Sequence, residues 1–457
     1  MPLTTAATWR PAWWLPVLFG SWAAAIAVVP SPGAKALLLA PAALAVLGWW
    51  TVQTPVRWLV LFFGAALLLP PLPIPLGDSG PHLAMLFAAA GLFAGVLWLR
   101  QWRVPPDALN ASFVLLSGAL LLSVAPAAFY SGANAAAGSL ARVCLFGISV
   151  YVFFYGAYGP GRSADSMRGT QLLYWAATLS ALFACVDFYY QFPAPAGYGP
   201  QFVWLDSGVY RRAQGLFYEA STLGNFCAFF LTMIAVAFSR PRRESPVSRP
   251  ALIFGGAVFF AALVLSYSRA SLINVAIALA VLAWYNRSRL PVFRIAACIC
   301  AAALLTWWIF PSFAEMYWQR ISNTAQYLFT RTEGVLSGRL SSWHTLADWI
   351  AAHPWQAMFG IGYKTLPYTN FLGDPIVADN MYLSLLVETG VLGVASLVWL
   401  NIAILRAMAR RARSSFFAMW MLCFWAGQTV QFASGDLLTY WRVLPVYFWI
   451  LSLALRL

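Results

Sequence analysis

Residues 251–286 read ALIFGGAVFFAALVLSY, then Ser268-Arg269, then ASLINVAIALAVLAWYN. Two apolar runs, each close to the length of a helix that crosses the hydrocarbon core of a bilayer, are separated by only two polar residues. Runs of this kind recur along the whole chain, which has 457 residues and is 61% hydrophobic but only 9% charged. Soluble globular proteins do not carry so much apolar surface. The sequence therefore predicts an all-α, polytopic integral membrane protein.

The apolar runs predict about 14 membrane crossings in a single membrane domain that covers residues 1–457. Twelve or thirteen crossings remain open, because short runs near the N-terminus also suit re-entrant segments. A transmembrane β-barrel would instead show short alternating strands. The predicted spans are Trp13–Val29, Ala36–Val52, Trp58–Leu76, Leu83–Leu99, Ala111–Tyr130, Leu140–Tyr158, Gln171–Phe192, Gly215–Ser239, Ala251–Tyr267, Ala270–Asn286, Ile295–Phe310, Asn380–Leu405, Phe416–Ala433 and Leu437–Leu455.

Arginine-rich links between the runs predict the orientation. If the spans alternate, these links fall on one side of the membrane together with both termini, and the positive-inside rule identifies that side as the cytoplasm. The links also account for much of the net charge of +14, so the charge does not indicate a nucleic-acid partner. The links contain Arg100/Arg103, Arg162/Arg168, Arg240/Arg242/Arg243/Arg249, Arg287/Arg289/Arg294 and Arg406/Arg410/Arg411/Arg413.

One long polar interruption, residues 311–378, falls on the outer side of this predicted topology. It is too long for an ordinary connection between spans. Within it, residues 339–353 carry apolar side chains at i, i+3 and i+4 spacing, which predicts a helix lying on the membrane surface or on the bundle. We expect the chemistry of this protein on the outer side, in a site closed by this loop.

Several arginines remain on the outer side, against the orientation bias. Such residues indicate an anionic partner, because the guanidinium group matches phosphate oxygens well. Adjacent Arg211 and Arg212 precede a span and suit a diphosphate, although contact with lipid headgroups explains them equally well. Arg269 lies in a hairpin so tight that its charge stays close to the protein interior, which favours a functional role.

The large loop and the span that follows it supply candidates for acid–base chemistry. Arg339 begins the predicted helix, and His344 within that helix is a candidate base or a surface residue. Asp379 opens a span, where a carboxylate serves as a helix cap or, near arginines, as a general base. Gly360 and Gly362 would let the backbone approach a ligand closely.

The sequence contains no phosphate-binding loop, nucleotide fingerprint or metal-ligand cluster, so we predict an enzyme without a cofactor. Its six cysteines fall in apolar runs, which is typical of small buried side chains. An enzyme on the outer side has no nucleotide sugars available, so its donor must be carried by a lipid. Arginines can stabilise the negative charge of a polyprenyl diphosphate leaving group without a metal.

Four short elements around the outer loop resemble the O-antigen ligase and polymerase superfamily in their order and spacing. The resemblance covers roughly residues 211–393 and predicts a ligase- or polymerase-like core over residues 193–393, which includes the loop at 311–378. The elements are Arg212 with Leu216; Ser268-Arg269; Gly338-Arg339 with Trp343, His353-Pro354 and Gly360-Ile361-Gly362; and Asp379-Asn380 with Gly390 and Gly393.

This resemblance implies a GT-C-like, metal-independent, inverting glycosyltransferase of the bacterial inner membrane with a periplasmic active site. Such an enzyme would transfer a glycan from undecaprenyl diphosphate to an acceptor hydroxyl. Arg211, Arg212 and Arg269 would hold the diphosphate, and Arg339 would assist. The ligases carry histidine where this chain has Asp379, a departure that favours a polymerase, with Asp379 as the base and His344 as its substitute or helper.

Three alternatives stay open at the level of the sequence. The first is an O-antigen ligase that attaches the glycan to lipid A–core, and the second transfers the glycan to a protein hydroxyl. The third is a flippase for the lipid-linked glycan, which would use the same arginines without chemistry. A flippase needs polar groups along a path from both sides, whereas the unexplained polar residues here gather on the outer side.

Overall fold

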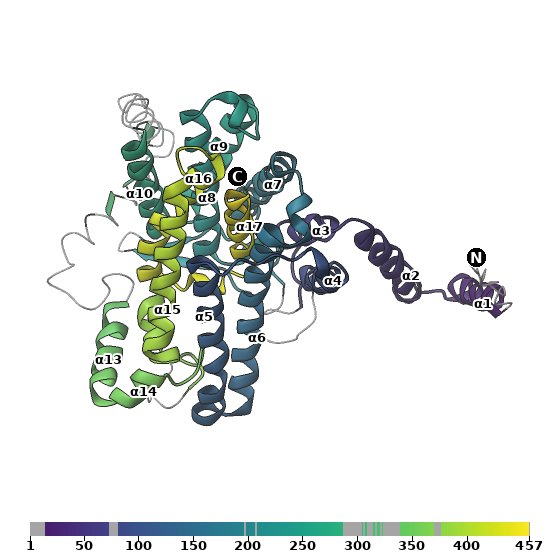
Figure 1. Cartoon of the computed structure of the whole chain (residues 1–457), viewed down its shortest axis with the longest axis horizontal. Coiled ribbons are helices and arrows are strands. Elements are labelled where there is room, and N and C mark those ends of the chain that lie inside the picture. Colours follow the sequence, from purple (N-terminus) through teal and green to yellow (C-terminus); the bar gives the residue numbers. More distant parts are fainter. Residues whose placement is uncertain are drawn as a thin grey trace, which may run out of the picture.

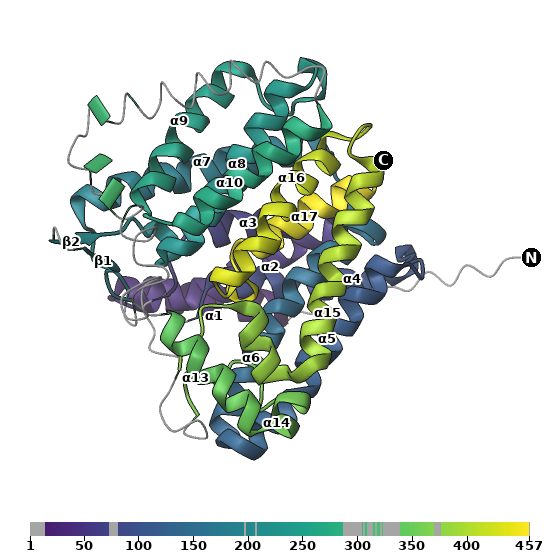
Figure 2. The same cartoon turned by 90° about the vertical axis from the view of Figure 1, so that its left-hand side faces the viewer.

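The computed structural model describes residues 14–72, 81–195, 198–205, 208–286, 339–369 and 376–456, with isolated residues between 304 and 322. The described part is mostly helical (Figure 1), with one antiparallel pair of short strands, β1 and β2 (Figure 2). The predicted span Ile295–Phe310 and the first part of the outer loop lie largely outside the described residues. For the described chain, the all-α prediction is confirmed.

The elements follow one another in the order that the hydropathy pattern predicts. Short 3-10 turns, η3 (Gly215–Phe217), η6 (Phe432–Ser434) and η7 (Leu437–Thr439), join some of them. The main elements are α1 (Trp14–Val28), α2 (Pro32–Gln53), α3 (Arg57–Leu68), α4 (Leu83–Leu97), α5 (Ala108–Leu122), α6 (Val124–Tyr158), α7 (Ser166–Tyr190), β1 (Phe202–Leu205), β2 (Gly208–Arg211), α8 (Ala220–Ser239), α9 (Arg249–Leu265), α10 (Arg269–Tyr285), α13 (Arg339–Ala352), α14 (Pro354–Phe359), α15 (Met381–Arg411), α16 (Phe416–Gln431) and α17 (Leu444–Leu455).

Four described helical stretches are long and apolar enough to cross a membrane by length and composition: α5 with α6, α7, α8 and α15. Shorter apolar helices, such as α9, α10 and α17, coincide with further predicted spans. The total of about 14 crossings stays a prediction. The helix predicted at residues 339–353 is confirmed as α13.

Helix α8 lies at the centre of the bundle. The ring of Phe229 packs on Trp420 of α16 and on Tyr447 of α17, with centroid distances of 4.3 Å and 4.5 Å. Phe424 adds an edge contact at 4.8 Å. Because aromatic side chains bury large apolar areas, this cluster holds α8, α16 and α17 together.

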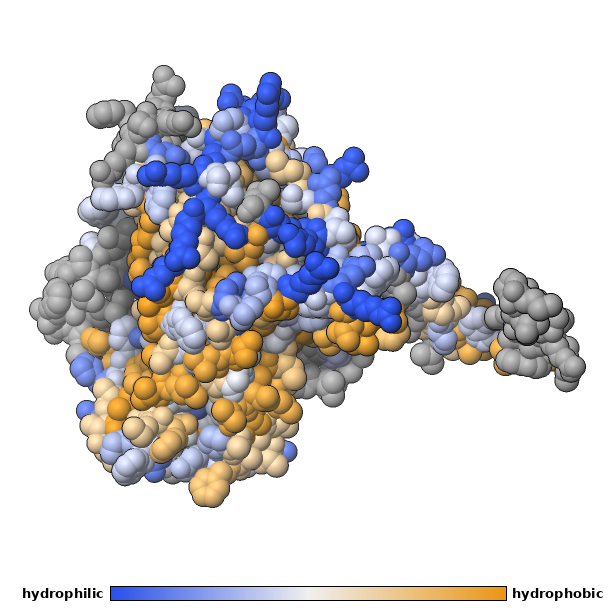
Figure 3. Space-filling model, in the orientation of Figure 1, coloured by the Kyte–Doolittle hydropathy of each residue, from blue (hydrophilic) through white to orange (hydrophobic). Residues whose placement is uncertain are grey.

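The basic links gather at one end of the bundle. The guanidinium of Arg240, after α8, donates to the carbonyl of Ala412, after α15. Arg456, beyond α17, donates to the carbonyl of Arg162, after α6, at 3.3 Å. Figure 3 shows hydrophilic residues collected at this upper end, with a hydrophobic surface below. The alternation of the predicted spans agrees with this arrangement, whereas the side that faces the cytoplasm stays a prediction.

Helix α15 reverses direction instead of crossing as one straight span. The backbone of Gly390 has φ of 70° and ψ of −169°, which breaks the helical geometry. On a straight helix, Tyr382 and Asn401 would lie ~28 Å apart. Instead, Asn401 Nδ2 donates to the hydroxyl of Tyr382 at 3.4 Å. Residues 381–389 therefore form an arm that folds back along residues 391–411, which corrects the prediction of a single continuous run.

The glycines at 360 and 362 explain how this arm ends. Gly360 and Gly362 both have positive φ, at 84° and 122°. Their segment lies against the end of the arm, where Ile361 N donates to the carbonyl of Val387 at 3.0 Å and Gly362 N to that of Glu388 at 2.8 Å. These bonds satisfy carbonyls that a helix end leaves free. The close backbone approach predicted for these glycines is thus made to α15.

Replacing Gly390 by alanine is expected to lower the free energy of unfolding by ~1–3 kcal/mol, because an L side chain rarely adopts its backbone conformation. An added Cβ would also overlap the carbonyl of Met358. Thermal unfolding of the purified protein in detergent measures the loss. Gly64→Ala in α3 is the matched control, since an added Cβ there meets no atom within 4 Å. Equal melting temperatures for the two variants would contradict the role given to Gly390.

Candidate functional site

Backbone strain concentrates around the elements that the sequence singles out. A non-glycine residue with positive φ costs about 1–3 kcal/mol and tends to persist where function requires it. Among the described residues five have this geometry, and four of them stand beside or within the predicted site elements. These four are Tyr218, two residues after Leu216; Tyr267, directly before Ser268-Arg269; Lys364, two residues after Gly362; and Asp379.

Asn380 takes the capping role that Asp379 could have had. Its Oδ1 accepts hydrogen bonds from the backbone N–H groups of Tyr382 and Leu383, at 3.1 Å and 3.2 Å. An Asn at this position satisfies the free donors at the start of a helix. The carboxylate of Asp379 is therefore not used as the cap of α15.

The carboxylate of Asp379 faces α13 instead. Its Oδ2 accepts a hydrogen bond from Arg339 Nε at 3.0 Å, and the side chain of Asp379 remains 43% exposed. One turn further along α13, Trp343 Nε1 donates to the carbonyl of Ala378 at 2.6 Å. Two residues at i and i+4 on one face of α13 thus hold the segment that carries Asp379. The pair brings together two predicted site residues that are 40 positions apart.

His344 lies elsewhere on the same helix. It follows Trp343 directly, so its side chain leaves α13 on a different face, and it is exposed. In Figures 1 and 2, α13 and α14 lie at the end of the bundle away from the C-terminus of the chain. His344 is therefore near the site in sequence, on the outer surface of the helix that supports Asp379.

The structure also joins the two arginine elements that precede the loop. Arg212 Nε donates to the carbonyl of Ser266 at 2.9 Å, and the backbone N–H of Ala213 donates to Leu265 O at 2.8 Å. These bonds place the segment of Arg212 against the turn between α9 and α10. Arg269, half-buried, is the first residue of α10 directly after that turn.

Arg211 points to a different partner from Arg212. Its guanidinium lies 3.5 Å from the carboxylate of Asp187 in α7, and both side chains are largely buried, with exposures of 15% and 11%. The pairing explains the acidic residue near the end of the apolar run of α7. The charge of Arg211 is therefore already balanced in this arrangement.

Glu219 links the arginine side of the site to Asp379. Burial raises the pKa of its carboxyl group; the Thr222 hydroxyl, which donates at 2.7 Å, and the charge of Arg212 act in the opposite direction. The charge of Asp379 raises the pKa of Glu219 further. Burial also holds the pKa of Tyr440 well above its usual range, helped by Glu219 and Asp379. The charges of Arg212 and Asp379 thus both influence the pKa values of Glu219 and Tyr440.

Sequence reasoning missed a second ion pair, which Lys364 forms with Asp436. Burial lowers the pKa of Lys364, and the nearby charge of Glu388 opposes that shift. Asp436 lies between α16 and α17, so the pair ties the outer loop to the last two helices. The available signal was the alternation of the predicted spans, which puts the short link at residues 434–436 on the same side as residues 311–378.

Replacing Lys364 by methionine is expected to lower the free energy of unfolding by ~3–5 kcal/mol, because the carboxylate of Asp436 is then left without its buried cation. The double variant Lys364→Met/Asp436→Asn should recover part of this loss. Thermal unfolding of the three proteins in one detergent gives the comparison. Additive losses in the double variant would show that the two side chains do not interact.

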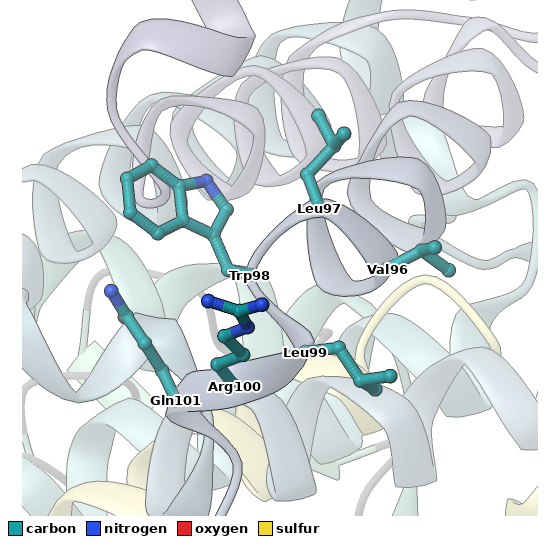
Figure 4. Close-up of a pocket in the computed structure, with 6 residues that line it drawn as sticks. All are labelled: Val96, Leu97, Trp98, Leu99, Arg100 and Gln101. Carbon is teal, nitrogen blue, oxygen red and sulfur yellow. The ribbon is translucent and has the colours of Figure 1, made fainter. Parts of the chain in front are cut away.

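A separate hollow lies at the end of α4 and is lined by residues 96–101 (Figure 4). All six lining residues come from one continuous segment, which carries none of the candidate site residues. The hollow therefore plays no part in the site described above.

The elements around Asp379 lie in a stretch that matches a known protein family. The O-antigen ligase family matches residues 254–398. The match runs from α9 through the outer loop into α15, and it contains Arg269, Arg339, His344 and Asp379. It confirms the resemblance to the O-antigen ligase and polymerase superfamily. Arg211 and Arg212 precede the matched region. The comparison with curated proteins gives no match.

The O-antigen ligase match supports several coarse statements. Members of this family are glycosyltransferase-like enzymes, and the match indicates a ligase- or polymerase-type function. The family implies a lipid-linked glycan and an acceptor as substrates. Together with the apolar helices, it indicates a membrane protein.

Proposed function

We propose that this protein is a glycosyltransferase of the bacterial inner membrane with a periplasmic active site and both termini in the cytoplasm. It transfers a glycan from undecaprenyl diphosphate to an acceptor hydroxyl and polymerises polysaccharide repeat units. The observation that carries the proposal is the Arg339–Asp379 pair, whose carboxylate is half-exposed. The charges of Asp379 and Arg212 both act on the buried carboxyl group of Glu219. The O-antigen ligase match supports the substrate class.

In the proposed reaction, Asp379 accepts the proton of the acceptor hydroxyl. The hydroxyl oxygen attacks the anomeric carbon from the face opposite the leaving group, and the bond between that carbon and the phosphate oxygen breaks with inversion. The electron pair remains on undecaprenyl diphosphate, whose charge Arg212 and Arg269 stabilise. Arg339 orients Asp379, and no metal is required.

Arg211 and His344 have supporting roles in this proposal. Arg211 is paired with Asp187 in the structure. When the diphosphate is bound, the positive charge of Arg211 adds to that of Arg212 in attracting it. His344, exposed on α13, serves as a helper base when the acceptor lies over that helix. Both residues are assigned smaller effects than Asp379 and Arg212.

A ligase is the second candidate, because the matched family is described as O-antigen ligase. In that case the acceptor is lipid A–core or a protein hydroxyl, and the same residues serve the transfer. Aspartate at position 379, where the ligases carry histidine, is the feature that favours the polymerase.

Surface glycan from a strain that lacks this gene tests the proposal. Glycans are resolved on a gel, and lipid-linked intermediates are analysed in parallel. Loss of long chains, with single repeat units still attached to the acceptor, supports the polymerase. Full-length chains that accumulate on undecaprenyl diphosphate support the ligase. Accumulation of lipid-linked repeat units on the cytoplasmic side would overturn both and favour a flippase.

A further inference from the structure

Four buried amide side chains meet inside the helical bundle. Asn225 of α8 and Asn274 of α10 are fully buried, and Gln428 and Gln431 of α16 are at most 4% exposed. Asn225 Nδ2 donates to the Oε1 atoms of Gln428 and Gln431, at 2.8 Å and 2.9 Å. Asn274 Nδ2 donates to the same two atoms, at 3.3 Å and 2.9 Å. We call this closed set of four hydrogen bonds the amide square.

The amide square requires close contact between the helices. An added Cβ at Gly427 would overlap the side chain of Asn274, and one at Gly224 would press on the hydroxyls of the Ser266–Ser271 segment. Small residues at such positions let helix backbones approach each other in an apolar environment. Four amides buried within spans are costly unless they are paired. Such a network therefore tends to specify one helix register.

A chain of hydrogen bonds leads from the amide square to the candidate site. Gln431 Nε2 donates to the hydroxyl of Ser271 at 3.2 Å. The hydroxyls of Ser271 and Ser268 lie 2.8 Å apart. Ser268 is the N-cap residue of α10, and the next residue is Arg269. At the other side of the square, the hydroxyl of Tyr447 in α17 donates to Asn225 Oδ1 at 2.6 Å.

We infer that the amide square, acting through Ser271 and Ser268, positions Arg269 for the diphosphate of the lipid-linked donor. This inference rests on the proposed function. A slip of α10 by one residue against α8 and α16 would turn its first residue by about 100° and move it by ~1.5 Å. Arg269 would then be displaced from the turn to which Arg212 is bound through Ser266. Gln431, Asn274 and Ser271 are therefore positioning residues.

Ser271→Ala gives the sharpest test, because it removes the link to Ser268 and leaves the four amides in place. We expect the Kd for undecaprenyl diphosphate and the KM for the lipid-linked glycan to rise ~5- to 30-fold, the effect of one lost buried hydrogen bond. The fall in kcat should be smaller than this rise in KM, because Arg269 keeps its charge near the leaving diphosphate and Asp379 is untouched. Gln431→Leu should also raise KM by a larger factor than it lowers kcat, and its rise in KM should exceed that of Ser271→Ala.

Thr232→Val is the matched control. Thr232 is a buried residue of α8 whose hydroxyl donates to Ala228 O of its own helix at 2.8 Å, so its loss removes a hydroxyl without a link between helices. If Ser271→Ala and Thr232→Val leave KM and Kd equally unchanged, the inference is wrong. If the wild-type protein neither binds undecaprenyl diphosphate nor transfers glycan, the proposed function itself fails.

Discussion

Replacing Asp379 by asparagine is expected to reduce the rate of glycan transfer by ~10²- to 10⁴-fold, the usual contribution of a general base. Asparagine keeps the shape of the side chain and can still accept a hydrogen bond from Arg339, but it cannot take the proton of the acceptor hydroxyl. Single-turnover transfer from a purified lipid-linked glycan, with the protein in detergent or vesicles, measures the change. Donor affinity should stay near the wild-type value.

The control for this substitution is Asp348→Asn, which removes an exposed carboxylate from the same supporting helix, α13. It is expected to transfer glycan at the wild-type rate. If Asp379→Asn also transfers normally, Asp379 is not the base. His344→Ala is then the variant to measure, since His344 is the remaining titratable candidate on α13.

Replacing Arg212 by alanine is expected to lower kcat/KM by ~10²- to 10³-fold, because the leaving diphosphate loses a preorganised cation. Lysine should restore little of this activity. In the structure Arg212 Nε donates to Ser266 O, and in the proposed complex the same guanidinium fork also binds phosphate oxygens. A lysine ammonium is a single point charge that cannot serve both functions.

Arg413→Ala provides the comparison, because Arg413 is an exposed arginine of a basic link at the opposite end of the bundle. The kcat/KM values of Arg212→Ala, Arg212→Lys and Arg413→Ala should distinguish an effect of the cation at position 212 from an effect of the total charge of the protein. Equal losses in Arg212→Ala and Arg413→Ala would indicate that the net charge, and not the position of Arg212, matters for the reaction.

Local patterns in the sequence predicted much of the helical framework. The apolar runs around Ser268 are α9 and α10, and the i, i+3, i+4 pattern after Gly338 is α13. These features depend on hydrophobic periodicity and on short polar breaks, which a single sequence displays. The arginines predicted on the outer side could be singled out by another local signal, because they violate the charge bias expected between the two sides of a membrane.

The pairings within the site could not be predicted in the same way. Arg339 meets Asp379 across 40 positions, and Lys364 meets Asp436 from a separate part of the chain. Tertiary packing selects these partners, and hydropathy carries no information about them. The reversal of α15 was missed because Gly390 and its neighbours form part of one apolar run, while the φ value that breaks the helix leaves no trace in hydropathy.

The reversal at Gly390 changes how labelling experiments on this protein should be interpreted. A depth scale that counts residues from the start of α15 would place Tyr382 nearest the external solvent and Val391 deeper. The structure gives the opposite order: Tyr382 is half-buried and donates to Thr429 O at 2.8 Å, while Val391 is 53% exposed at the tip. Cysteines introduced along the arm should therefore react faster near position 391 than near position 382.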